Sequence, residues 1–89
     1  MTLEEICDAI AEVVQDLMYG DISVSHKADI LDDILAVIGW DVAEGIEPPL
    51  ENVKETLARL EDFQLTYNVD LKNPIMNLKK YVSNKEKEE

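Results

Sequence analysis

The spacing of apolar residues constrains the fold of this chain more than any other feature of its sequence. In four segments the apolar side chains recur every three to four positions, and no segment shows the sustained two-residue alternation of a strand. In the first segment, seven of them fall within an arc of about 140° on a helical projection. These residues are Leu3, Ile6, Ile10, Val13, Val14, Leu17 and Met18. The pattern predicts an all-α fold, a small three- or four-helix bundle with short loops.

The expected first helix covers residues 3–19. Thr2 and Glu5 have the spacing of a capping box at its start, and Gly20 suits the left-handed residue that ends many helices. The expected second helix is apolar around most of its circumference, which is typical of a helix packed on several sides.

The ends of the second helix are less sharply marked. We expect it to begin after Ser23 or Ser25 and to end at Gly39. Trp40 then follows the helix, where a residue often folds back onto the last turn. The alternative is an exposed Trp40 that contacts a partner, since tryptophan is enriched at interface hot spots.

The second half of the chain is punctuated by prolines. Residues 41–49 form a connector that holds Pro48 and Pro49, and Pro49 suits the first position of a third helix that ends between residues 63 and 67. After a loop at 68–73, a fourth helix is expected over 74–83. The sequence therefore predicts a single helical domain over residues 1–83 and a charged, flexible C-terminal tail over residues 84–89.

Length and composition limit the class of protein. Eighty-nine residues make one domain with a modest core. The single cysteine, Cys7, excludes an internal disulfide and fits a reducing compartment. The opening MTLEEI lacks the basic and apolar pattern of a secretion signal, and the longest apolar run is ILAVI at 34–38. We expect a cytoplasmic protein with no membrane association.

The net charge of −12 is concentrated in one part of the chain. Residues 1–52 hold 13 acidic residues and one basic residue, Lys27, whereas residues 53–89 hold seven of each. A field of this sign repels nucleic acid and anionic membranes and attracts basic surfaces. Direct nucleic-acid binding is therefore not expected.

Acidic residues in the first helix follow a strict four-residue step. Glu4, Asp8, Glu12 and Asp16 have no basic residue among them, and each i,i+4 pair of like charges costs roughly 0.2–0.5 kcal/mol. In the second helix, Asp29, Asp32 and Asp33 share one narrow strip with Ala36. A solvated outer face explains their polarity but not the missing lysines.

The residues for catalysis or metal binding are sparse. His26 is the only histidine and Cys7 the only cysteine, and no zinc, phosphate-loop, dinucleotide or calcium motif occurs. We expect no enzyme activity, no metal and no cofactor.

Three families of similar size or composition are informative. Glu5-x-x-Asp8 and Asp29-x-x-Asp32 resemble the paired acidic motifs of all-helical nucleoside triphosphate pyrophosphohydrolases, a resemblance that implies bound Mg²⁺. However, Glu5 and Asp8 lie opposite the face expected to pack on the second helix. The stretch DISVSHKAD lacks the Asp-Ser-Leu motif of acyl carrier proteins. Colicin-type immunity proteins are similar in physical type only.

Two functional hypotheses follow. In the first, the protein is an acidic inhibitor or regulator, a nucleic-acid mimic of the kind that phages and mobile elements encode, and its anionic face docks on the basic surface of a nucleic-acid-binding partner. The residues expected to bind the partner are Glu4, Asp8, Glu12, Asp16, Asp29, Asp32, Asp33 and Trp40. In the alternative, the charge serves solubility, and a homodimer or subunit-type adaptor uses an apolar surface around Trp40. The other residues of that surface are Ile46, Leu65, Tyr67, Met76 and Tyr81.

Overall fold

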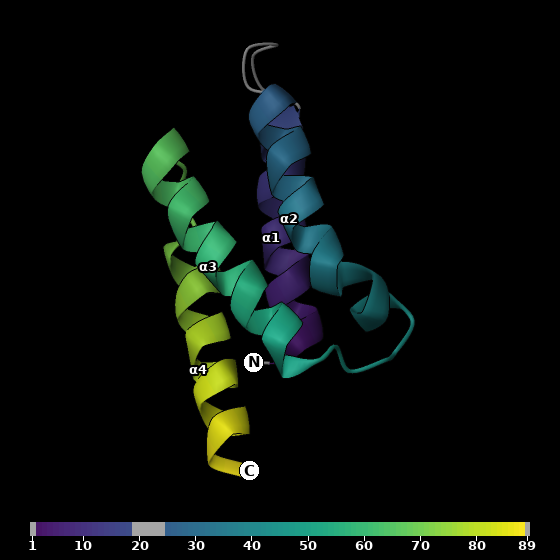
Figure 1. The fold of residues 1–89 in the computed structure, drawn as a ribbon. Helices are drawn as coiled ribbons and strands as arrows, with labels where there is room; N and C mark the ends of the chain where they lie inside the picture. The colour runs from purple at the N-terminus through teal and green to yellow at the C-terminus, as the bar shows by residue number, and fades with distance from the viewer. Residues whose placement is uncertain (1, 19–24, 89) are drawn as a thin grey trace.

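The computed structural model describes residues 2–18 and 25–88, and within these ranges it contains four helices and no strand. The helices are α1 (Leu3–Met18), α2 (Ser25–Ala43), α3 (Leu50–Tyr67) and α4 (Lys72–Glu88) (Figure 1). The all-α bundle expected from the apolar periodicity is confirmed, with four helices rather than three. The expectations that concern Tyr19, Gly20 and Ser23 lie outside the described residues.

The four helices form a closed ring of contacts. α1 packs on α2, α2 on α3, α3 on α4, and α4 returns to α1, whereas the two diagonal pairs have no Cα atoms within 8 Å of each other. Successive helices run in opposite directions, so both ends of the chain and the connector before α3 lie at the same end of the bundle (Figure 1). The chain therefore has the up-and-down topology that short loops favour.

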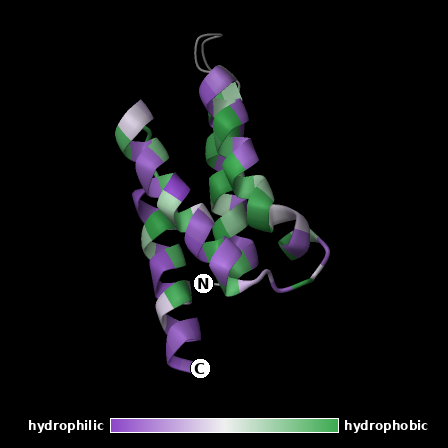
Figure 2. Cartoon of the chain, viewed as in Figure 1, coloured by the Kyte–Doolittle hydropathy of each residue, from purple (hydrophilic) through white to green (hydrophobic). Residues whose placement is uncertain are grey.

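The core is built from one apolar side of each helix. Its fully buried members are mostly Ile and Leu. The largest of them are Ile6, Ile10, Leu31, Ile38, Leu60, Leu71 and Leu78. In Figure 2 hydrophobic and hydrophilic residues alternate along each helix, as expected of helices that bury one side. In α1 the apolar arc found in the sequence points inward, although Val13 and Leu17 are only partly covered and Met18 is 59 % exposed.

α1 begins with the expected cap. The backbone N–H of Glu5 donates a hydrogen bond to Thr2 Oγ1 at 3.2 Å, and the Thr2 hydroxyl donates to Glu5 Oε1 at the same distance. The carboxylate thus bonds the threonine hydroxyl instead of the backbone N–H that a capping box uses.

α2 does not end at Gly39, as the sequence suggested, but continues to Ala43. The left-handed residue is Gly45, with φ of 77°. Gly45 N–H donates to the Val42 carbonyl at 3.1 Å, and Ile46 N–H donates to the Asp41 carbonyl at 2.8 Å. These two bonds form a Schellman motif that satisfies the last carbonyls of the helix. The expectation that Trp40 follows the helix end is therefore wrong.

α3 begins one residue later than expected and ends at Tyr67, within the expected range, whereas both ends of α4 differ from those expected. Pro49 precedes α3 as its N-cap, where its carbonyl accepts hydrogen bonds from the next turn, and Asn68 ends the helix with φ of 55°. α4 starts at Lys72, so that Pro74 lies within its first turn, where a backbone N–H has no intrahelical partner to lose. Asp70 Oδ1 accepts a hydrogen bond from Lys72 N–H at 3.2 Å.

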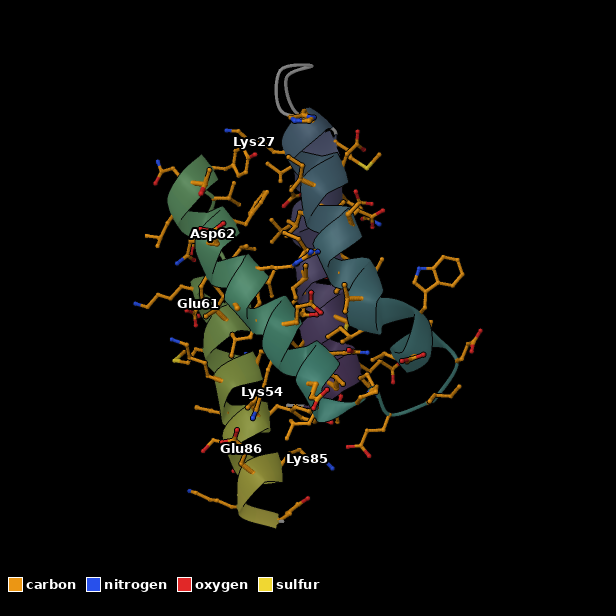
Figure 3. All side chains as sticks on the ribbon, in the orientation of Figure 1. Lys27, Lys54, Glu61, Asp62, Lys85 and Glu86 are labelled. Atoms are coloured by element: carbon orange, nitrogen blue, oxygen red, sulfur yellow. The ribbon has the colours of Figure 1, made fainter. Side chains whose placement is uncertain are left out.

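Residues 84–88, which the sequence placed in a tail, are the last turn of α4. Two ion pairs tie this turn to the rest of the bundle: Lys54 Nζ lies 2.5 Å from Glu86 Oε1, and Lys85 Nζ lies 2.6 Å from Glu47 Oε1. Figure 3 shows Lys54 and Glu86 facing each other across the α3–α4 contact. Lys85 and Lys87 also favour a helix end, because its free carbonyls carry partial negative charge.

Within residues 2–18 and 25–88, we find no helix with the length and apolar character that crossing a bilayer requires.

Candidate protein-docking surface

The acidic row of α1 points out of the bundle. Glu4, Asp8, Glu12 and Asp16 are all exposed, and none of them forms an ion pair with a described residue. The nearest candidates for such pairing in the sequence have other partners: Lys54 pairs with Glu86, and Arg59 Nε lies 3.8 Å from Glu55 Oε1. The like charges of α1 therefore remain uncompensated within the described part of the chain.

The spacing of this row resembles that of a nucleic-acid strand. Residues 4 to 16 span about 18 Å along a helix axis, and they carry five carboxylates when Glu5 is included. That is roughly one negative charge per 4 Å, compared with one per 3.4 Å along each strand of duplex DNA. A rigid helix thus presents negative charge at nearly the linear density of one DNA strand.

α2 adds a second acidic strip, and here the structure extends what the sequence suggested. Asp29, Asp32 and Asp33 are exposed. Because the helix continues through Gly39, Trp40 falls on the same outer face, within an arc of about 120° that also includes Ala36. The Trp40 side chain is 73 % exposed, so it does not fold back onto the helix. The signal for this placement was present in the sequence, since Trp40 lies four residues after Ala36 and seven after Asp33.

A shallow depression of about 550 Å³ adjoins Trp40. The small residues Ala36, Gly39 and Ala43 line it together with Leu35 and with the acidic residues Asp32 and Glu44. The end of α2 thus combines an exposed aromatic ring, a low apolar surface and carboxylates on one face. We call Asp29, Asp32, Asp33, Ala36 and Trp40 the α2 strip.

Three of the other apolar residues of the alternative surface, Leu65, Tyr67 and Tyr81, make contacts elsewhere in the bundle. Tyr67 is partly buried and packs on Phe63, with ring centroids 4.8 Å apart. Tyr81 is partly buried and donates a hydrogen bond from its hydroxyl to Glu47 Oε1 at 2.9 Å. Leu65, at 82 % exposed, belongs to α3 and adjoins Lys72 of α4 rather than the α2 strip.

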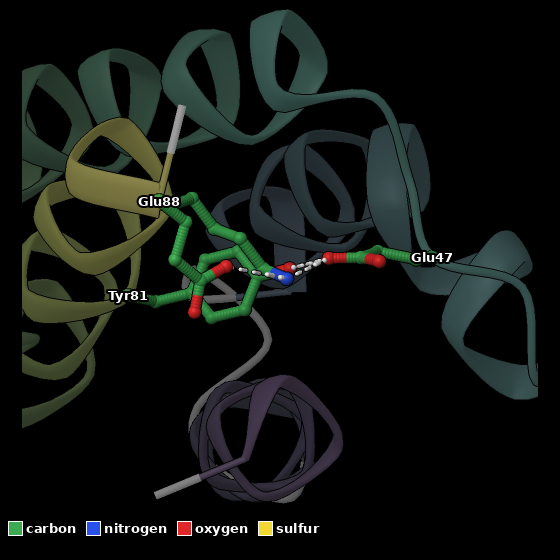
Figure 4. A network of polar contacts seen from close by, with 4 residues as sticks. Glu47, Tyr81 and Glu88 are labelled. Carbon is green, nitrogen blue, oxygen red and sulfur yellow. Dashed lines mark hydrogen bonds and ion pairs between the residues drawn. The ribbon is translucent and has the colours of Figure 1, made fainter.

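A polar network joins the connector to the end of α4, and sequence reasoning did not find it (Figure 4). Lys85 Nζ contacts Glu47 Oε1 at 2.6 Å and Glu88 Oε2 at 3.6 Å. The pKa of Glu47 is lowered mainly by the hydrogen bond from Lys85 and to a smaller extent by the one from Tyr81. The hydrogen bond to Glu47 raises the pKa of Lys85. The pKa of Tyr81 is raised mainly by burial and to a smaller extent by its hydrogen bond to Glu47. Residues 38 positions apart in the sequence are thereby held together.

The residues considered for catalysis are not assembled into a site. Cys7 is buried, and burial, with a smaller effect of Asp8, raises the pKa of its thiol to about 11. Such a thiol is a poor nucleophile at neutral pH. His26 is exposed in the first turn of α2. Among residues 2–18 and 25–88, no group of three or more His, Cys, Asp or Glu side chains could hold a metal ion.

The fold and this surface define a small acidic four-helix bundle whose first two helices carry outward-facing carboxylates. Comparison of the chain with models of protein families, with curated proteins and with solved structures found no match.

Proposed function

We propose that the protein is an interaction module, an inhibitor or regulator that docks its anionic face on the basic, nucleic-acid-binding surface of a partner protein. The observation that carries the proposal is the row Glu4, Asp8, Glu12 and Asp16, which is fully outward and unpaired within the described chain. A groove lined with Lys and Arg would neutralise these like charges and relieve their mutual repulsion. The negative field of residues 1–52 would also speed the encounter.

Two double variants with the same change in net charge test the proposal. Asp8→Lys/Glu12→Lys reverses the centre of the row, and Glu51→Lys/Asp62→Lys makes the same change in net charge at exposed acids of α3. Immobilised wild-type protein and both variants are exposed to a heparin-binding protein fraction at low salt. We expect the wild type and the α3 variant to retain the same protein, and the α1 variant to lose it by tenfold or more.

The second half of the experiment addresses mimicry. Duplex DNA added to the bound complex should displace the partner, since both ligands would occupy one basic groove, and raising the salt should release it steeply. Equal retention by the α1 and α3 variants would contradict the proposal, as would a complex that resists both DNA and salt.

A second candidate function is favoured by the exposure of Trp40. An exposed tryptophan beside a shallow apolar depression is suited to a partner that buries the ring, with the acidic rim setting the orientation. In this case Trp40→Ala would abolish binding, salt would weaken it little, and Asp8→Lys/Glu12→Lys would leave it intact. Binding by Trp40→Ala, binding by Asp8→Lys/Glu12→Lys and the effect of salt together distinguish the two candidates.

A further inference from the structure

α4 carries a surface whose charge is opposite to that of the α2 strip. Lys72, Met76, Lys79 and Lys80 lie within an arc of about 100° on its outer side, and all four are exposed, with Met76 at 43 %. We call these four residues the α4 stripe. Lys79 Nζ lies 3.1 Å from Glu61 Oε1, whereas Lys72 and Lys80 form no ion pair with any described residue.

The α4 stripe is also partly apolar and recessed. A depression of about 480 Å³ lies between Lys72, Met76 and Lys80, and a second one beside Lys72 is lined by Leu65 and Gln64. The exposed Met76 side chain thus has Lys72, Lys79 and Lys80 around it, and Leu65 adjoins Lys72 and Asp70, whereas Trp40 adjoins Asp32 and Glu44. The two surfaces are complementary both in charge and in the position of their apolar parts.

We propose that the occupant of the α4 stripe is the α2 strip of a second copy of this chain, packed antiparallel. With Ala36 placed opposite Met76, the same register sets Asp33 beside Lys80 and Asp32 beside Lys79, because residue numbers on antiparallel helices then add to about 112. The inference rests on the second candidate function and specifies its partner.

The small residues of α2 make this register sterically reasonable. Ala36 and Gly39 allow two helix axes to approach to about 8–10 Å, so that the Met76 side chain enters the depression beside Trp40. At the other end, Trp40 comes to lie against Lys72 and Leu65, where an ammonium group over the indole face adds a cation–π contact. In this register each of the four residues of the α4 stripe contacts a residue of the α2 strip.

The two surfaces lie on different helices, so the contact is head-to-tail. A copy bound through its α2 strip keeps its own α4 stripe free, and association continues into a ring or a chain. The net charge of −12 on each copy opposes this assembly at long range. At about 150 mM salt the repulsion is screened beyond roughly 8 Å, whereas the short-range contacts remain.

The experiment measures the mass of the full chain by analytical ultracentrifugation at this salt concentration. For the wild type we expect the mass to rise above the monomer value of 10.1 kDa as the protein concentration approaches the order of 1 mM. Asp33→Lys and Lys80→Asp should each weaken association at least tenfold, because each places like charges opposite one another. Circular dichroism confirms that both variants remain helical.

The decisive sample is the equimolar mixture of Asp33→Lys and Lys80→Asp. In the mixture the lysine introduced on α2 of one variant can pair with the aspartate introduced on α4 of the other, so association should return although each variant alone stays monomeric. Asp62→Lys, which changes an exposed acid outside both surfaces, should associate like the wild type or better. A wild type that stays at 10.1 kDa at the highest concentration would overturn the proposal, and so would a mixture that remains monomeric.

The outcome is independent of the acidic row on α1. Asp8→Lys/Glu12→Lys leaves both the α2 strip and the α4 stripe unchanged, so it should self-associate at least as well as the wild type. Loss of DNA-competitive partner binding in that variant, with self-association retained, separates the two proposals. Loss of self-association in that variant would count against the antiparallel register of α2 on α4.

Discussion

Thr56 is the one polar side chain among the buried core residues of the described chain. It is fully inaccessible to solvent, and its Oγ1 has no hydrogen-bond partner. A threonine in a helix commonly bonds the carbonyl four residues earlier, which this side chain does not do. An unsatisfied buried hydroxyl costs about 1–3 kcal/mol, so the core carries an avoidable destabilisation at this position.

We expect Thr56→Val to raise the free energy of unfolding by about 1 kcal/mol, because valine has nearly the same shape and removes the unsatisfied hydroxyl. In a domain of this size the midpoint of thermal unfolding would rise by roughly 4–8 °C. Thr66→Val, on the exposed side of the same helix, serves as the control and should change stability little. Equal effects of the two substitutions would show that the gain comes from helix propensity or hydrophobicity and not from the buried hydroxyl.

Trp40 shows what single-residue reasoning from the sequence can and cannot settle. Because tryptophan is enriched at interfaces, contact of Trp40 with a partner was one of two alternatives. The exposure of Trp40 could not be predicted, because it depends on where α2 ends. That end was placed at Gly39 because glycine is common after a helix. The chain offers a second glycine, Gly45, six residues later, and only three-dimensional structure shows which one adopts positive φ.

At the scale of single helices, α2 provides a direct test of this correction. Gly39 lies inside the helix, and a Cβ added there would meet Leu35 Cγ at 3.6 Å, an ordinary contact. Gly39→Ala should therefore stabilise the protein by about 0.5–1 kcal/mol, as alanine does in a helix interior. Chemical denaturation measures the change.

Gly45→Ala is the matched substitution, and its effect should have the opposite sign. No atom lies within 4 Å of the added Cβ, but φ of 77° is strained for alanine and costs about 1 kcal/mol. If Gly39 were the residue that ends the helix, the two signs would be reversed.

The helices as elements were largely predictable, whereas the end of α2 and both ends of α4 were not. Apolar periodicity identified four helical segments and the inward face of α1, because burial of one side of a helix requires that spacing. The end of α4 was placed five residues too early, since a run of Lys and Glu has no apolar face. Its last turn is held by ion pairs to Lys54 and Glu47, which come from distant parts of the sequence.

For the whole molecule, the network of Glu47, Tyr81 and Lys85 connects the acidic half of the chain with its electrically neutral half. The pKa of Glu47 lies below its ordinary value of 4.5, owing first to the hydrogen bond from Lys85. A lowered pKa means that the stabilisation is complete above pH 4.5 and is lost as the pH falls through the lowered value.

The resulting expectation concerns the difference in unfolding free energy between the wild type and Glu47→Gln. This difference should be constant between about pH 6 and 8 and should shrink as the pH falls below the ordinary value of 4.5. Denaturant titrations at several pH values measure it. Glu44→Gln, which changes an exposed acid of the same connector with no ion pair to a described residue, serves as the control. A difference that persists at pH 3 would rule out the ionised Glu47 as the origin.

The exposure of the acidic residues was predictable from the sequence, but their arrangement relative to Trp40 was not. The outward position of the α1 row followed from the apolar arc on the opposite side of the same helix. The common face of Trp40 and the aspartates of α2 depended on where α2 ends, and the α4 stripe depended on where α4 begins. The spacing of residues within one helix does not predict these arrangements.

The contact between α4 and α1 has a consequence for how the protein matures on the ribosome. α4, which closes the ring, is synthesised after the other three helices, and the neutral half is synthesised after the half that carries all of the net charge. Mutual repulsion among the carboxylates of this nascent half disfavours premature collapse. The packing of α1 on α4 is therefore expected to form only after α4 has left the ribosome.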